Sequence, residues 1–202
     1  MLEAFLIGVL AGYAIAIPVG PIAVLILRTG MRDGLRAAMA AGAGTASADV
    51  VYSTLAMVAG PALVALIAPV LLPARLLAAA VLLVLAVRQL RGLDLADTER
   101  APAPVARTYA TVLALTLLNP ATVIYFASLA VGLPKISTEP AARVFFVAGA
   151  GLSSLSWQWL LAGAGSALHG RVPARLGLLT AVASSAIIAL LALKIAADAV
   201  VG

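Results

Sequence analysis

Two long apolar runs constrain this 202-residue chain more than any other feature. Leu2 to Leu27 and Val144 to Leu168 each exceed the roughly 20 apolar residues that an α-helix needs to cross a bilayer. Only 10% of the residues are charged and 64% are hydrophobic, whereas soluble domains have about 25% and 45–50%. The sequence therefore predicts an integral membrane protein that crosses the bilayer several times, with lipid as its solvent.

Hydropathy along the chain predicts six membrane-spanning helices. They cover about Leu2 to Leu27, Ala37 to Ala59, Ala74 to Leu90, Tyr109 to Leu133, Val144 to Leu168 and Leu176 to Leu193. The segment from Gly60 to Pro73 is also apolar, but it contains three prolines, which disfavour a regular helix. We expect this segment to be a re-entrant or interfacial connection.

The positions of the basic residues predict how the six helices are oriented. Most of the 13 Lys and Arg residues fall in the connections after helices one, three and five, namely Arg28, Arg32, Arg36, Arg88, Arg91, Arg100, Arg107, Arg171 and Arg175. The opposite side receives Arg75, Lys135, Arg143 and Lys194. Because cytoplasmic loops carry an excess of Lys and Arg, this pattern predicts a multi-pass protein with both termini outside the cytoplasm.

A polar segment, residues 92–108, divides the single membrane domain 1–202 into two three-helix halves, 1–91 and 109–202. The motif Ala41-Gly42-Ala43-Gly44 in helix two recurs as Ala148-Gly149-Ala150-Gly151 in helix five. Since each half has an odd number of helices, the halves would be inverted repeats, a common transporter construction. We therefore expect an all-α fold of six transmembrane helices, with residues 92–108 as a cytoplasmic linker.

Helices one and four each contain a proline motif that should interrupt them. Pro18, Gly20 and Pro21 lie within the first run, and Asn119 with Pro120 lies within the fourth. Proline removes a backbone donor, and broken helices are tolerated in lipid only where the backbone meets protein or a water-filled cavity. Breaks at corresponding places favour a transport pathway over the alternative, a pair of packing kinks.

Asp49 is the one acidic residue well inside a predicted span, and its burial costs about 2.5–3.5 kcal/mol on insertion scales. Thr45 and Ser53 share its helical face, and Tyr52 adjoins that face. We favour a functional carboxylate, which binds a cationic group or exchanges a proton, over a structural one.

Helix five presents a second polar face, with Ser154 and Gln158, that either lines the same cavity or only joins helices. The small residues of Gly8-x-x-x-Gly12 allow close backbone approach, either within the chain or between two copies in a homodimer. Together, the residues assigned to the substrate pathway are Pro18, Gly20, Pro21, Gly42, Thr45, Asp49, Tyr52, Asn119, Pro120, Ser154 and Gln158.

Composition also argues against several other kinds of site. The net charge is +5, but the basic residues are scattered in short connections, so a nucleic-acid partner is not expected. The chain has no cysteine and a single histidine, His169, and thus we expect no metal site and no cofactor. The expected partners are a small-molecule substrate and the lipid bilayer.

The order of these motifs resembles the lysine exporter (LysE/RhtB-type) translocator family over nearly the whole chain. The resemblance rests on Pro18-x-Gly20-Pro21, Gly30-x-x-x-Gly34, Gly42-x-Gly44 leading to Asp49, and Leu118-Asn119-Pro120 followed by Tyr125-Phe126. It implies export of amino acids or related solutes across the bacterial inner membrane, driven by the proton motive force, with Asp49 as the proton-coupling residue.

Two other functions stay open at this point. A metal-ion exporter is the first alternative, although one intramembrane carboxylate without a thiol is a weak cation site. An integral membrane enzyme is the second, because Asp33-Gly34 followed by Arg36 is similar to the opening of a CDP-alcohol phosphotransferase motif. The further aspartates of that motif are missing, so we do not expect an enzyme.

Overall fold

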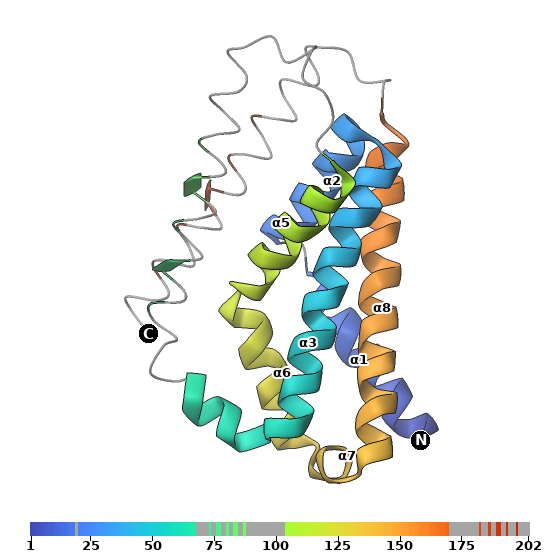
Figure 1. Cartoon of the computed structure of the whole chain (residues 1–202), viewed down its shortest axis with the longest axis vertical. Coiled ribbons are helices and arrows are strands. Elements are labelled where there is room, and N and C mark those ends of the chain that lie inside the picture. Colours follow the sequence, from blue (N-terminus) through green and yellow to red (C-terminus); the bar gives the residue numbers. More distant parts are fainter. Residues whose placement is uncertain are drawn as a thin grey trace.

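The computed structural model describes residues 1–18, 20–67 and 104–169, with single positions between 73 and 87 and between 182 and 197. These residues form helices and no strand. The helices are α1 (Leu2–Ala16), α2 (Pro21–Asp33), α3 (Leu35–Ile67), α5 (Val105–Leu117), α6 (Pro120–Gly132), α7 (Pro134–Thr138) and α8 (Pro140–Ser166) (Figure 1). The predicted all-α class and both predicted helix breaks are therefore confirmed for the described residues.

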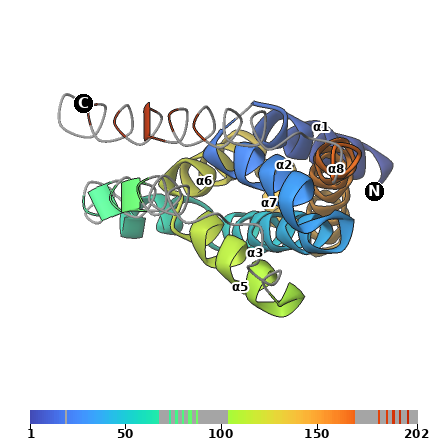
Figure 2. The ribbon, with the colours of Figure 1, turned by 90° about the horizontal axis from the view of Figure 1, so that it is seen from above.

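Two long helices, α3 and α8, form the centre of the described bundle, and each carries one broken helix along its length. The pair α1 and α2 packs along α8, and the pair α5 and α6 packs along α3. Figure 2 places α1 and α2 on one side of α3 and α5 on the other. The short helix α7 connects α6 to α8 at the end of the bundle opposite the α2–α3 junction (Figure 1).

The recurring Ala-Gly-Ala-Gly motif explains how closely these helices approach. Gly149 of α8 lies against the backbone of α1, where an added Cβ would collide with the Phe5 carbonyl oxygen and the Val9 nitrogen. Gly44 of α3 lies in the same way against the backbone of α5 at Tyr109. Each copy of the motif thus seats the first half of a broken helix on an uninterrupted one.

The Gly8-x-x-x-Gly12 motif makes the reciprocal contact within the chain. Gly8 lies against the backbone of Phe146, and Gly12 lies against that of Ala150 and the side chain of Ser153. Of the two uses that the sequence allowed for this motif, the structure shows the intramolecular one. A homodimer is not tested by it.

Several predicted helix boundaries were wrong. Helix α3 continues through Pro61 to Ile67, so the first part of the expected connection from Gly60 to Pro73 is helical. A proline inside a helix can bend it without ending it, and the last turns of α3 turn aside in Figure 1. Helix α5 begins at Val105 instead of Tyr109, because the polar residues ahead of the apolar run are compatible with a helix.

The membrane-spanning character rests on the described helices that are long and apolar. Pro140–Ser166 is long and apolar enough to cross a bilayer by itself. Helices α1 and α2 meet the same criterion as a pair, bent by 78° at their break. Apart from single positions, the spans predicted at Ala74 to Leu90 and Leu176 to Leu193 lie outside the described residues.

The buried core is divided into two apolar clusters with a polar level between them. One cluster lies toward α7 and consists of Ala4, Ala11, Ala56, Met57, Phe126, Ile136, Ala142, Phe146 and Ala150. The other lies toward the α2–α3 junction and consists of Ala23, Ile26, Ala38, Ala41, Val112, Leu161 and Ala162. Buried polar residues, among them Thr45, Asp49, Ser154 and Gln158, occupy the turns of α3 and α8 between the clusters. The packing therefore positions a polar site at mid-height.

We predict that Gly149→Ala destabilises the protein and that Gly163→Ala, on the same helix, does not. The added methyl group at 149 meets the α1 backbone and should cost on the order of 1–3 kcal/mol of overpacking. At 163 nothing lies within 4 Å, and alanine is the better helix former. Thermal unfolding in detergent measures both, and equal melting temperatures for the two variants would contradict the α1–α8 contact.

Candidate functional site

The first helix break leaves a helix N-terminus without a side-chain cap. Helix α1 ends at Ala16, and α2 begins at Pro21 after Gly20 in an extended conformation with φ −113°. Proline suits the first helical position because its missing N–H would have no partner there. The first backbone hydrogen bond of α2 is from Val24 N to Gly20 O, at 3.2 Å. The amide groups ahead of Val24 are left for another acceptor.

The second break has a similar construction around Asn119. Helix α5 ends at Leu117, and α6 begins at Pro120. The Asn119 backbone N–H donates to Thr116 O at 3.0 Å, and its side-chain Nδ2 donates to Thr122 Oγ1 at 3.2 Å. The asparagine side chain thus donates a hydrogen bond across the break. Its link to Thr122 ties the end of α5 to the first turn of α6.

A short hydrogen bond joins the two uninterrupted helices at the level of these breaks. Ser154 Oγ of α8 donates to Asp49 Oδ2 of α3 at 2.6 Å. Asp49 is 3% exposed and Ser154 is fully buried. Hydrogen bonds to a carboxylate are short and strong, and a buried charge needs such a partner. The Ser154 hydroxyl uses one carboxylate oxygen, and no side chain of the described residues donates to the other, Oδ1.

Both helix breaks and Asp49 meet at one cavity of about 100 Å³. The cavity is lined by residues of α1, α2, α3, α5, α6 and α8 and of the two breaks. The lining residues are Ile15, Ala16, Pro18, Gly20, Pro21, Ile22, Ala23, Thr45, Asp49, Thr116, Asn119, Thr122 and Gln158. The structure thus brings together seven of the residues that the sequence assigned to a pathway.

Gln158 has an unused acceptor at this cavity. The residue is 4% exposed, and its Oε1 atom has no hydrogen-bond partner among the described residues. Gly42 explains its position, because a Cβ at residue 42 would lie 2.9 Å from the Gln158 Cβ. A buried carbonyl oxygen without a donor costs about 1–3 kcal/mol, so a ligand that donates to it would recover that energy.

Four of the assigned residues are not among those that line the cavity, namely Gly42, Tyr52, Pro120 and Ser154. Tyr52 donates its hydroxyl to the carbonyl oxygen of Leu117, at the end of α5. Ser154 and Gly42 act through Asp49 and Gln158, as described above. For Pro120 the structure describes the backbone at the start of α6. Their assignment to a substrate pathway stays a prediction.

Sequence reasoning missed Thr116 and Thr122, both 3% exposed, which line the cavity on either side of the second break. Thr116 donates to Val112 O at 2.8 Å, and Thr122 accepts from Asn119. The signal that could have identified them is their position three residues before and after Asn119, one hydroxyl residue on each side of the predicted break.

A larger hollow of about 960 Å³ lies elsewhere, along α3 and α8. Its lining is mostly aliphatic, with Val50, Val58 and Leu152 among the exposed residues. An apolar outer face is what lipid contact requires, and this hollow includes no residue of the helix breaks. We therefore place the candidate site at the smaller, polar cavity.

The described residues contain no group of three or more His, Asp or Glu side chains that could hold a metal ion. His169, the single histidine, lies at the exposed end of α8, where its Nδ1 is 3.0 Å from the Met31 carbonyl oxygen. It is therefore distant in the fold from Asp49, which lies between the two apolar clusters.

Comparison with known proteins identifies a match at the level of a family. The family model of the LysE type translocator matches residues 13–199, which is nearly the whole chain and includes both helix breaks. No curated protein and no solved structure gives a significant match.

We predict that Thr122→Cys reacts with a small, water-soluble thiol reagent at least about tenfold faster than Ala127→Cys. Both residues lie on α6 and are almost fully buried, at 3% and 2%, but Thr122 lines the cavity and Ala127 does not. The natural chain contains no cysteine, so each variant carries a single thiol. Labelling is followed by mass spectrometry in membranes, and equal rates would mean that water does not reach the cavity.

Proposed function

The chain belongs to the LysE type translocator family, and from that membership we propose that it exports amino acids or related small solutes by proton antiport. Family membership makes the protein a membrane exporter of small solutes. The amino-acid cargo and the coupling to protons are our proposal. They are supported by a polar cavity with one carboxylate, enclosed by two broken helices.

We propose the predicted six-span arrangement for the whole chain, with two inverted three-helix repeats, 1–91 and 109–202, in the bacterial inner membrane. The described helices support it, because α1 and α2 pack on α8 as α5 and α6 pack on α3. In inverted-repeat transporters the substrate site lies near the midplane, between such halves. The cavity lies at this position, between the two apolar clusters.

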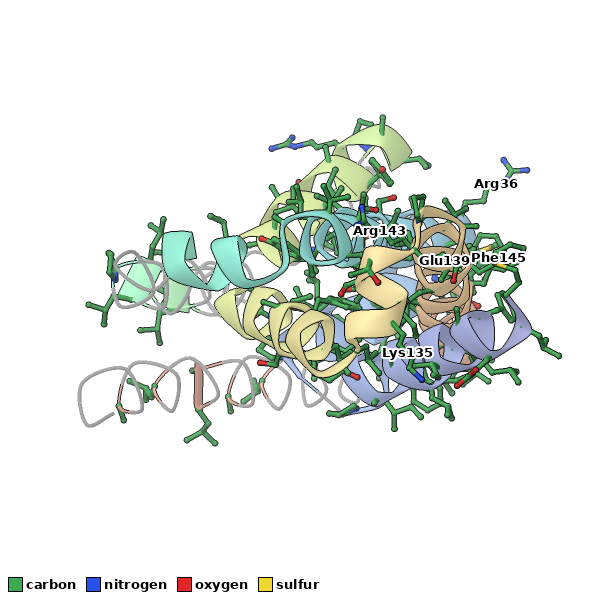
Figure 3. All side chains as sticks on the ribbon, turned by 90° about the horizontal axis from the view of Figure 1, so that it is seen from below. Arg36, Lys135, Glu139, Arg143 and Phe145 are labelled. Carbon is green, nitrogen blue, oxygen red and sulfur yellow. The ribbon has the colours of Figure 1, made fainter. Side chains whose placement is uncertain are left out.

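Charges at the two ends of the bundle support an orientation with both termini outside. The end with the α2–α3 junction carries Arg32 and Arg36. The opposite end, which Figure 3 views from below, carries Lys135, Glu139 and Arg143 around α7. Arg28 of α2 and Arg107 at the start of α5 lie toward the same end as Arg32 and Arg36, and Asp33 is the acidic residue there. The positive-inside rule counts Lys and Arg, so this excess over Lys135 and Arg143 favours the α2–α3 junction as the cytoplasmic end.

Asp49 carries the proposal for proton coupling. Its carboxylate is the one ionisable group among the described residues that line the cavity. A buried carboxylate is stabilised either by a proton or by a cationic partner, and these two states exclude each other. A substrate ammonium leaving Asp49 would therefore be exchanged for a proton entering from the other side, which is the requirement of an antiporter.

We predict that Asp49→Asn abolishes uptake driven by a pH gradient, with a loss of at least about tenfold. Asparagine keeps the size of the side chain but cannot exchange a proton. Asp33→Asn is the matched control, because Asp33 lies at the end of α2 beside Arg32, at 3.6 Å, and should keep the parental rate. Purified protein in proteoliposomes with an imposed gradient measures both. A parental rate and pH dependence in Asp49→Asn would remove the coupling role.

The cargo itself is tested in cells that overproduce the protein. We expect the internal pool of at least one amino acid to fall and its external concentration to rise, relative to cells with Asp49→Asn. Quantification of all amino acids on both sides of the membrane measures this change. Unchanged pools throughout, with the protein present in the membrane, would contradict amino-acid export.

A further inference from the structure

We propose that the cavity binds the zwitterionic head of a small neutral α-amino acid, with the ammonium at Asp49 and Gln158 and the carboxylate at the N-termini of α2 and α6. The inference rests on the proposed export of amino acids and adds the orientation and the size of the cargo. It follows from three properties of the cavity, which are its acceptors, its donors and its dimensions.

The acceptors come from the two uninterrupted helices. Asp49 Oδ2 accepts from Ser154 at 2.6 Å, and no side chain of the described residues donates to Oδ1, which can accept from a ligand. Gln158 lines the same cavity and is 4% exposed. Its Oε1 atom has no partner among the described residues. An ammonium group carries three N–H donors and a positive charge. It would satisfy the amide oxygen and neutralise the carboxylate together.

The donors come from the broken helices. Ile22 and Ala23, in the first turn of α2, line the cavity, and no side chain caps this helix among the described residues. Thr122, in the first turn of α6, also lines it. Its oxygen accepts from Asn119, and its O–H can donate as well, so it can serve a ligand. First-turn amide groups and the positive end of a helix bind carboxylates well.

These two sets of groups give the cavity opposite polarities. The acceptors are on α3 and α8, and the donors are on α2 and α6. A solute with a single charge would leave one set without a partner in a buried site, at the cost of unsatisfied polar groups. A zwitterion satisfies both sets, and neither a simple cation nor a simple anion does.

The dimensions of the cavity limit the side chain of the cargo. Its volume is about 100 Å³, below the roughly 300–1,000 Å³ of common small-molecule pockets. Ile15, Ala16 and Ile22 supply the remaining apolar lining. Among the described lining residues no second carboxylate is present to pair with a charged side chain. The site therefore fits amino acids such as alanine or glycine better than lysine or glutamate.

Counterflow of labelled L-alanine in proteoliposomes, at fixed pH, tests the proposal on the unaltered protein. Four unlabelled competitors separate its elements. L-alaninamide keeps the ammonium and lacks the carboxylate, L-lactate keeps the carboxylate and lacks the ammonium, and L-lysine and L-glutamate add a charged side chain. We expect unlabelled L-alanine and glycine to compete at concentrations at least about tenfold lower than any of the four. L-alaninamide and L-lactate each lose a hydrogen bond to a charged group, and L-lysine and L-glutamate bring a charged side chain that the small cavity does not pair.

The outcomes distinguish this inference from the proposal on which it rests. If labelled L-lysine or L-glutamate is carried and L-alanine is not, amino-acid transport stands and the inference is overturned. If L-alaninamide or L-lactate competes as well as L-alanine, the donors or the acceptors of the cavity are not used, and the inference is again overturned. If no amino acid is carried by active, folded protein, the proposed function fails as well.

A pair of substitutions on α8 tests the acceptor at Gln158. Gln158→Met keeps the volume and removes the amide, and we expect it to raise the half-saturation concentration of L-alanine about tenfold. Trp157→Phe is the control, because Trp157 Nε1 is also buried without a partner among the described residues but does not line the cavity. Equal half-saturation in the two variants would remove Gln158 from the site, and the competitor series above is independent of whether either variant folds.

Discussion

The hydrogen bond from Ser154 to Asp49 is the interaction around which the described structure is organised. It joins the two uninterrupted helices, α3 and α8, at 2.6 Å, in a region where a charge without a partner would be very costly. Each of these helices also carries one broken helix on a face of small residues, such as Gly149 on α8 and Gly44 on α3. The same pair of helices therefore holds the bundle together and presents the carboxylate to both breaks.

The two helix breaks depend on neighbouring residues for their hydrogen bonds. A helix interrupted inside a bilayer exposes backbone groups that lipid cannot satisfy. In this chain, Asn119 bonds to Thr122 across the second break, and the Tyr52 hydroxyl donates to the Leu117 carbonyl. The first turn of α2, which no side chain caps among the described residues, lies beside the cavity. The polar groups available to a solute are thus the ones that helix packing does not use.

A site of this kind couples recognition to transport. The groups that would recognise an ammonium lie on the uninterrupted helices, and those that would recognise a carboxylate lie at the starts of the second halves of the broken ones. A bound zwitterion would therefore bridge both kinds of helix, and its departure would leave Asp49 needing a proton. This arrangement gives the antiport proposal a physical basis, because solute and proton would satisfy the same buried carboxylate.

The sequence by itself determined the membrane class, both helix breaks, the buried position of Asp49 and the polar faces of helices two and five, because proline chemistry, charge burial and helical periodicity act over a few residues. It was wrong about Pro61, which lies inside α3, since a proline can bend a helix without ending it. Only the tertiary structure decided that Gln158 lines the cavity with an Oε1 that has no partner among the described residues, that Ser154 is the partner of Asp49, and that Thr116 and Thr122 join them. Those assignments depend on which helices pack together and in what register. Local sequence patterns do not show contacts between residues about a hundred positions apart, such as Asp49 and Ser154.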